Sequence, residues 1–152
     1  MQQVIVQKFG GTSVGSGERI AAVAEIIKKE AEINNVVIVV SAMAGETDRL
    51  IELSKQFGDN QNKREFDALI STGEKVSASL LAMALNSLGL KAKSYSAAQV
   101  SLKTTSNFSK AKILDIDKAK MEEILADGSI PIITGFQGVT ETGEVTTLGR
   151  GG

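Results

Sequence analysis

The sequence predicts an α/β fold, a three-layer α/β/α sandwich built around a mainly parallel sheet. Short apolar runs alternate with helical patterns along the chain, which is typical of parallel sheets covered by helices. The run at residues 36–40 is apolar at every position, as expected for a strand buried on both faces. With 152 residues, of which 42% are hydrophobic, the chain is long enough for one domain or one large lobe.

The first half of the chain predicts two strands and several helices. Residues 3–8 are expected to form a strand, and residues 17–33 a helix with Ile20, Val23 and Ile27 on its buried face. The second strand covers residues 36–40, and a helix follows at 47–57. Two more helices are expected at 63–70 and 74–88, the second burying Val76, Leu80, Leu81, Leu85 and Leu88 and ending at Gly89.

The second half continues the alternation. A strand is expected at 91–96, and the weak periodicity of residues 101–112 predicts an exposed loop. Asp117 is the predicted N-cap of a helix that ends at Ala126. Residues 130–134 form another buried strand, and residues 139–147 a β-hairpin around Thr142-Gly143.

Composition excludes several function classes. The net charge of −1 gives no support for nucleic-acid or anionic-membrane binding, and no apolar run reaches the ~20 residues of a membrane span. The chain has no cysteine and no histidine, which excludes disulfides, common zinc sites and histidine-based triads within it. Because the N-terminus enters a strand without a secretory leader, a cytoplasmic location is expected.

The first candidate site is the segment Lys8–Ser13, which follows the first strand. The sequence predicts a glycine turn at Gly10 and Gly11, followed by the hydroxyl pair Thr12-Ser13 at the start of a helix. Glycines let backbone N–H groups approach a phosphate, and a lysine and a helix N-terminus add positive charge. The lysine precedes the glycines, so the segment is not a P-loop. A plain strand-to-helix turn fits these residues equally well, and both interpretations stay open.

Further candidates lie at other predicted strand and helix ends. Ser41 closes the second strand and either binds a ligand or satisfies loop backbone, while Thr47 has the position of a helix cap. Ser71 and Glu74 have the spacing of a capping box, which competes with a role for Glu74 in binding a ligand ammonium. Near the C-terminus, Arg150 lies among glycines, where a guanidinium can pair with a carboxylate or phosphate, or simply face solvent.

As a set, these motifs resemble those of the aspartate kinases, within the amino-acid kinase family. The matching segments are residues 8–14, 40–43, 71–74, 135–138 and 146–152, in the same order and spacing. The resemblance covers the whole chain. It implies the N-terminal lobe of a catalytic domain, cut before the nucleotide-binding lobe and the regulatory domains. A piece of this kind is expected to be inactive alone.

On the phosphate side, the resemblance implies that Lys8, Gly10, Gly11 and Ser13 bind the phosphates of ATP. Lys8 is then the catalytic residue, because its charge offsets that of the transferring phosphoryl group. Mg²⁺ is expected to arrive with the nucleotide, since the chain offers no protein metal site.

On the substrate side, the resemblance implies that Ser41, Thr47, Glu74, Arg150 and Gly151 bind L-aspartate. The implied reaction transfers the γ-phosphoryl group of ATP to the β-carboxylate, giving 4-phospho-L-aspartate, the first step of lysine, threonine and methionine biosynthesis. A carboxylate is already deprotonated at neutral pH, so the absence of histidine fits a reaction without a general base.

Two alternatives remain open at this point. One is a kinase for another small acid, such as glutamate or a carbamate. The other is a non-catalytic module for amino-acid binding or dimerisation, because members of this family form homodimers through this lobe.

Overall fold

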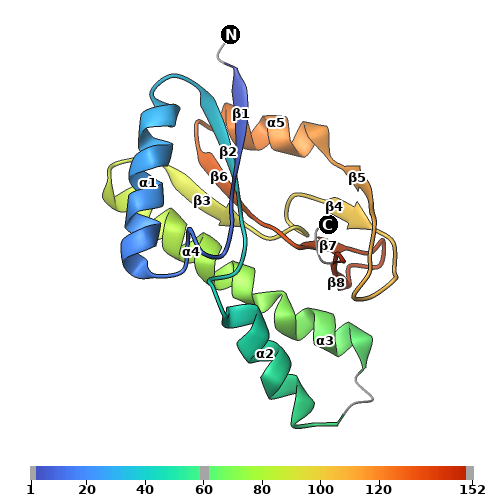
Figure 1. Ribbon diagram of the computed structural model, residues 1–152. Helices are drawn as coiled ribbons and strands as arrows, with labels where there is room; N and C mark the ends of the chain where they lie inside the picture. The colour runs from blue at the N-terminus through green and yellow to red at the C-terminus, as the bar shows by residue number, and fades with distance from the viewer. Residues whose placement is uncertain (1–2, 59–61, 150–152) are drawn as a thin grey trace.

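The computed structural model describes residues 3–58 and 62–149. Its larger sheet has four parallel strands in the order β1-β2-β6-β3, which confirms the predicted parallel architecture. These strands are β1 (Val4–Phe9), β2 (Asn35–Val40), β6 (Ile130–Thr134) and β3 (Ala92–Tyr95). Helices α1 (Gly17–Ala31) and α4 (Thr72–Ser87) cover one face and α5 (Lys118–Ala126) covers the other, giving three layers (Figure 1).

The apolar run of β2 forms a central strand because both of its faces are covered. Val36, Ile38 and Val40 pack into the core beneath α1 and α4. Val37 points the other way and joins a second cluster with Ile124 of α5. Side chains alternate between the faces of a strand, so a strand between two helical layers needs apolar residues at every position.

Several helix ends lie where the sequence predicts them. The Asp117 carboxylate accepts a hydrogen bond from the Lys120 N–H at 3.0 Å, which confirms Asp117 as the N-cap of α5. Ser16 caps α1 in the same way by accepting from the Arg19 N–H at 3.2 Å. Just beyond α4, Gly89 has a φ of +82°, a left-handed conformation that favours glycine after a helix.

The predicted buried face of α4 is partly wrong. Leu81 and Leu85 are fully buried, but 46% of Val76 and 37% of Leu80 are exposed. The helix packs against α1 and the sheet through a stripe that includes Ala78, Leu81 and Leu85, so residues 76 and 80 lie on its other side.

Two further helices extend away from the large sheet beyond the start of α4 (Figure 1). They are α2 (Glu46–Lys55) and α3 (Lys63–Ile70). Helices α3 and α4 follow each other directly, and the helical stretch Lys63–Ser87 is long and apolar enough to cross a membrane by length and composition. Half of its apolar window is buried inside this fold, so core packing accounts for its apolar character.

A smaller sheet has four short strands in the order β5-β4-β7-β8. Its strands are β5 (Ile113–Ile116), β4 (Leu102–Thr104), β7 (Gln137–Val139) and β8 (Val145–Thr147). The predicted hairpin is confirmed, because β7 and β8 pair antiparallel. The predicted exposed loop at 101–112 is partly wrong: residues 105–111 form a loop, but β4 covers Leu102–Thr104, and Thr104 is buried with its hydroxyl bonded to that of Thr146. A three-residue strand with a buried polar side chain has too few positions to show periodicity.

Candidate active site at the carboxyl ends of the parallel strands

The carboxyl ends of three parallel strands lie side by side at one edge of the large sheet. The backbone pairing continues past the strands, with the Ser41 N–H bonded to the Phe9 carbonyl at 3.0 Å. The Gly135 N–H donates to the Val40 carbonyl at 2.9 Å. Lys8, near the end of β1, and Ser41, directly after β2, therefore lie at the same edge, where ligands bind in open α/β sheets.

The turn after β1 is built differently from the prediction. Helix α1 starts at Gly17 after its cap Ser16, so the hydroxyl pair Thr12-Ser13 lies in the turn and does not open the helix. The Ser13 N–H donates to the Gly10 carbonyl at 3.0 Å and closes the turn.

The two glycines of this turn differ in their surroundings. A Cβ on Gly11 would lie 2.8 Å from the Ala42 carbonyl oxygen, and the Ala44 N–H donates to the Gly11 carbonyl at 3.1 Å. Gly11 therefore allows the segment after β2 to pack against the turn. A Cβ on Gly10 would meet no atom within 4 Å, so packing does not explain that glycine. Lys8 is exposed at the start of this segment.

Glu74, in the first turn of α4, is buried at the same edge. Only 2% of the residue is exposed. Its Oε1 accepts a hydrogen bond from the Ala42 N–H at 3.2 Å, and its Oε2 is buried without a partner in the described part of the chain. One turn later, the Ser77 hydroxyl donates to the Ser41 carbonyl at 2.7 Å, so two contacts hold α4 against the end of β2.

The capping-box interpretation of Ser71 and Glu74 is wrong. Ser71 has helical dihedrals (φ −67°, ψ −15°), and its hydroxyl donates backwards to the Ala68 carbonyl at 3.0 Å. Because Ser71 continues the helical path from α3 into α4, there is no free helix start for the pair to cap. The Glu74 carboxylate is thus directed to the end of β2.

Burial raises the pKa of Glu74 from its ordinary value of 4.5 to about 7, against the opposing effect of hydrogen bonds from its own backbone N–H and that of Ala42. Removal from water disfavours the charged form, and no positive side chain forms an ion pair with Glu74 within residues 3–58 and 62–149. A ligand cation at this carboxylate would provide the missing compensation.

Thr47 lies in the first turn of α2 and is half-buried. It is not the helix cap, because the N-cap is Gly45, whose φ is +81°. This first turn packs against α4, since a Cβ on Gly73 would lie 3.5 Å from the Glu46 Cγ. The structure thus brings Ser41, Thr47 and Glu74 to neighbouring elements at one edge of the sheet.

Arg150 and Gly151 lie outside the described residues. The structure follows their motif as far as Gly149, with Thr147 at the end of β8 and 1% exposed. Among the residues that the structure describes, no group of three or more His, Cys, Asp or Glu side chains gathers to hold a metal ion.

Sequence reasoning missed Asp67, in α3. It is fully buried, and its carboxylate accepts four hydrogen bonds, two from Ser109 and two from Thr147. A signal was present, because Asp67, Ile70, Ser71 and Glu74 have the i, i+3, i+4, i+7 spacing of one helix face. An aspartate that shares a helix face with buried residues is expected to be buried too, and therefore to need hydrogen-bond donors from other segments.

A three-layer parallel α/β lobe with a buried carboxylate and an exposed lysine at one sheet edge is typical of proteins that bind small polar ligands. Residues 3–152 match the model of the amino acid kinase family. The chain belongs to the amino acid kinase family.

Within that family, the chain is similar in sequence to several aspartate kinases. The chain is 53% identical over 150 residues to an aspartate kinase of Pseudomonas putida, covering 98% of this chain and 36% of that protein. It is also 53% identical to an aspartokinase of Geobacillus stearothermophilus, covering 98% of this chain and 37% of that protein. The chain thus spans little more than a third of the length of these curated relatives.

Solved structures agree with this assignment. The aspartate kinase from Synechocystis matches with a TM-score of 0.80 and 43% identity, over 99% of this chain and 24% of that one. The E. coli aspartokinase III in complex with aspartate and ADP matches with a TM-score of 0.80 and 25% identity, over 99% of this chain and 44% of that one. These matches confirm the predicted fold class and the resemblance to aspartate kinases.

Proposed function

We propose that this chain is the amino-acid- and phosphate-binding lobe of an aspartate kinase. The enzyme would transfer the γ-phosphoryl group of ATP to the β-carboxylate of L-aspartate, giving 4-phospho-L-aspartate for the biosynthesis of lysine, threonine and methionine. The identity of 53% to two aspartate kinases supports this substrate over glutamate or a carbamate.

The observation that carries the proposal is the unpartnered carboxylate oxygen of Glu74. A buried polar atom without a hydrogen bond is costly, and Oε2 of Glu74, next to the end of β2, is buried without a partner among the described residues. The α-ammonium group of an amino acid would supply both a donor and a positive charge. Ser41 and Thr47, on neighbouring elements, are the hydroxyls proposed to complete this side of the site.

The phosphate side is proposed to form around Lys8, Gly10, Gly11 and Ser13. Lys8 is exposed at the same sheet edge, so its charge is available to the γ-phosphoryl group. The open space at the Cβ position of Gly10 leaves its backbone accessible to a phosphate. Mg²⁺ would be bound mainly by the phosphates of the nucleotide.

Arg150 and Gly151 are proposed to bind a carboxylate of the substrate through the guanidinium and the adjacent backbone. With an ammonium at Glu74 and a carboxylate at Arg150, the second carboxylate of aspartate is left to attack the phosphoryl group. It needs no general base, so catalysis rests on alignment and charge stabilisation.

We also propose that a second copy of this chain covers the outer face of α4. Val76, Leu80 and Met83 have the i, i+4, i+7 spacing of one helix face, and 46%, 37% and 66% of them are exposed. A stripe of large apolar side chains on one helix favours pairing with a similar stripe.

The test uses a chimera in which this chain replaces the matching 150 residues of the G. stearothermophilus aspartokinase. We expect the chimera to form ADP from ATP and Mg²⁺ with L-aspartate, and to show no such turnover with L-glutamate. The 152-residue chain alone should be inactive. Turnover with glutamate or carbamate in place of aspartate, or binding of aspartate without any turnover, would contradict the proposal.

A further inference from the structure

Asp67 connects three separate parts of the chain. Its Oδ2 accepts backbone N–H groups of Ser109 and Thr147, both at 2.8 Å. Its Oδ1 accepts the hydroxyl groups of the same two residues, both at 2.9 Å. Helix α3, the loop at residues 105–111 and the end of β8 are therefore held by one carboxylate.

This carboxylate has no counter-ion within residues 3–58 and 62–149. Asp67 is fully buried, and only its four donors compensate the lost hydration. Replacing buried charged groups by apolar side chains of similar volume is often neutral or stabilising, so stability alone does not account for this carboxylate. Its four directed hydrogen bonds do fix three segments relative to one another. The arrangement thus favours a role in fixing position.

The helix that carries Asp67 leads directly to Glu74. The Ser71 N–H donates to the Asp67 carbonyl at 3.1 Å, and Glu74 follows one turn later. The other strand of the hairpin is attached to the same helical run, because the Gln137 side-chain amide donates to the Ser71 carbonyl at 3.0 Å. Both strands of the β7–β8 hairpin are thereby fastened to the two turns that precede Glu74.

We propose that Asp67 is a positioning residue that holds the end of β8 at a fixed place relative to Glu74 in the substrate site. Two helical turns separate it from Glu74 on the ammonium side, and Thr147 lies three residues before Arg150 on the carboxylate side. The proposal rests on the function proposed above. A substrate held at both ends requires a fixed separation between the elements that bind it, and Asp67 bonds directly to Thr147 of β8 and is joined through a single helix to Glu74.

The Ser109 branch offers an internal control. Ser109 has a φ of +66° and belongs to the loop at residues 105–111, which contributes no residue to the proposed site. Thr147→Val and Ser109→Ala each remove one hydroxyl donor from the same Oδ1 atom and leave the backbone bonds in place. They should lower the melting temperature to a similar degree, but only the first loosens the strand end that leads to Arg150.

The first measurement is hydrogen–deuterium exchange on the 152-residue chain. We expect the amides of residues 147 and 148 to exchange at least tenfold faster in Thr147→Val than in wild type, after correction for the intrinsic rate of each residue. In Ser109→Ala these two amides should exchange at the wild-type rate. Equal exchange at these amides in the two variants would overturn the proposal, whatever reaction the protein catalyses.

The second measurement is steady-state kinetics of the chimera. Thr147→Val should raise the KM for aspartate about five- to twentyfold and leave the KM for ATP unchanged. Ser109→Ala should leave both constants within twofold of the parent chimera. Equal changes in both variants, or a change in the KM for ATP alone, would refute the positioning role. An inactive parent chimera would instead refute the proposed function. The exchange experiment would still test whether Asp67 holds the end of β8.

Asp67→Asn separates charge from geometry. The amide oxygen can accept the two backbone N–H groups, and the amide nitrogen can donate to the two hydroxyls, which also act as acceptors. The KM for aspartate should therefore stay within about threefold of the parent, whereas Asp67→Ala should raise it at least as much as Thr147→Val. Parent-like kinetics in a folded Asp67→Ala variant would overturn the proposal.

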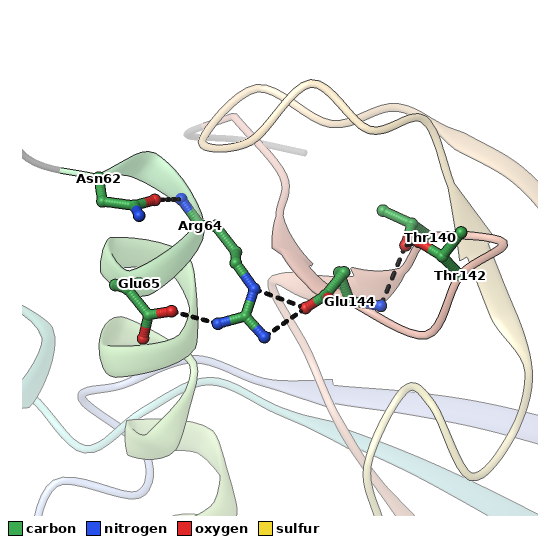
Figure 2. A network of polar contacts seen from close by, with 6 residues as sticks. All are labelled: Asn62, Arg64, Glu65, Thr140, Thr142 and Glu144. Carbon is green, nitrogen blue, oxygen red and sulfur yellow. Dashed lines mark hydrogen bonds and ion pairs between the residues drawn. The ribbon is translucent and has the colours of Figure 1, made fainter.

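A surface contact between the same two elements provides a matched control. Arg64, also on α3, forms an ion pair with Glu144 of the hairpin at 2.7 Å and contacts Glu65 (Figure 2). It links α3 to the hairpin three residues before Asp67 on one side and three residues before Thr147 on the other, and 47% of its side chain is exposed. Arg64→Gln should leave the KM for aspartate unchanged. A rise equal to that of Thr147→Val would mean that any contact between α3 and the hairpin suffices, and would remove the special role of Asp67.

Discussion

Replacing Glu74 by glutamine should change how the stability of this chain depends on pH. Burial raises the pKa of Glu74 from 4.5 to about 7 in the folded state. Between these two values the folded chain holds a proton that the unfolded chain has lost. Stability is therefore highest below pH 4.5 as far as this group is concerned, and it falls as the pH rises toward 7.

The size of this effect follows from the pKa change. A tenfold change in proton affinity corresponds to about 1.4 kcal/mol, so a rise from 4.5 to about 7 lowers the free energy of unfolding by about 3 kcal/mol at pH 8. Few other groups interfere, because the chain has no histidine. The pKa values of Glu46 and Asp127 are lowered by hydrogen bonds from Arg49 and Lys91, so their contributions are lost only in more acidic solution.

The assay is chemical denaturation of the 152-residue chain between pH 5 and pH 8. Wild type should lose about 2–3 kcal/mol over this range, because part of the total loss already occurs below pH 5. Glu74→Gln should lose almost none, because a glutamine keeps the bond from the Ala42 N–H and does not ionise. The substitution itself adds an offset that does not depend on pH, so the slopes of the two stability curves are compared and not their heights. Glu25→Gln, an exposed change on α1, should keep the wild-type slope. Parallel curves for wild type and Glu74→Gln would mean that the pKa of Glu74 is not raised by folding.

Three other outcomes are expected. Lys8→Ala in the chimera should lower kcat about 10²- to 10³-fold with an unchanged melting temperature, with the exposed Lys29→Ala as control; equal losses of rate and stability would contradict this. Gly11→Ala should cost about 1–3 kcal/mol in thermal denaturation because its Cβ meets a backbone oxygen at 2.8 Å, whereas Gly10→Ala should be nearly neutral for stability. Aspartate binding to the chimera at pH 7 should release about half a proton from Glu74, measured by calorimetry in two buffers of different ionisation enthalpy, and Glu74→Gln should release none.

The large sheet could be predicted because each of its strands is determined by local pattern. A run such as residues 36–40 is apolar throughout, and its strand is buried on both faces. The small sheet is different, because β4 has three residues and one of its two partners, β7, lies far along the chain, with Lys103 opposite Val139. Its position also depends on Thr146 of β8, whose buried hydroxyl bonds to that of Thr104. No window of sequence around residue 104 contains this information.

The candidate site shows the same division. The positions of Lys8 and Ser41 could be predicted, because both residues lie at the ends of strands that are evident in the sequence. The structure places both at one edge of the sheet. The role of Glu74 could not be read from spacing, because Ser-x-x-Glu predicts a cap only where a helix begins. Here Ser71 keeps helical dihedrals and joins two helices, so the spacing is coincidental and the carboxylate is free for another role.

The two buried carboxylates on the α3–α4 helical run differ in a way that burial alone does not explain. Asp67 and Glu74 are 0% and 2% exposed, and two turns of the same helical path separate them. Asp67 has a donor for every lone-pair direction, whereas Glu74 has one bonded oxygen and one without a partner among the described residues. If both acids served only to stabilise the fold, the unpartnered oxygen of Glu74 would lower the free energy of unfolding by about 1–3 kcal/mol without any compensating interaction. A ligand that donates a hydrogen bond to this oxygen binds more tightly for the same reason. The oxygen is already removed from water and held in place, so binding does not have to supply the free energy of either step. The pairing of one satisfied and one unsatisfied acid therefore favours a division in which Asp67 holds the geometry and Glu74 receives the substrate.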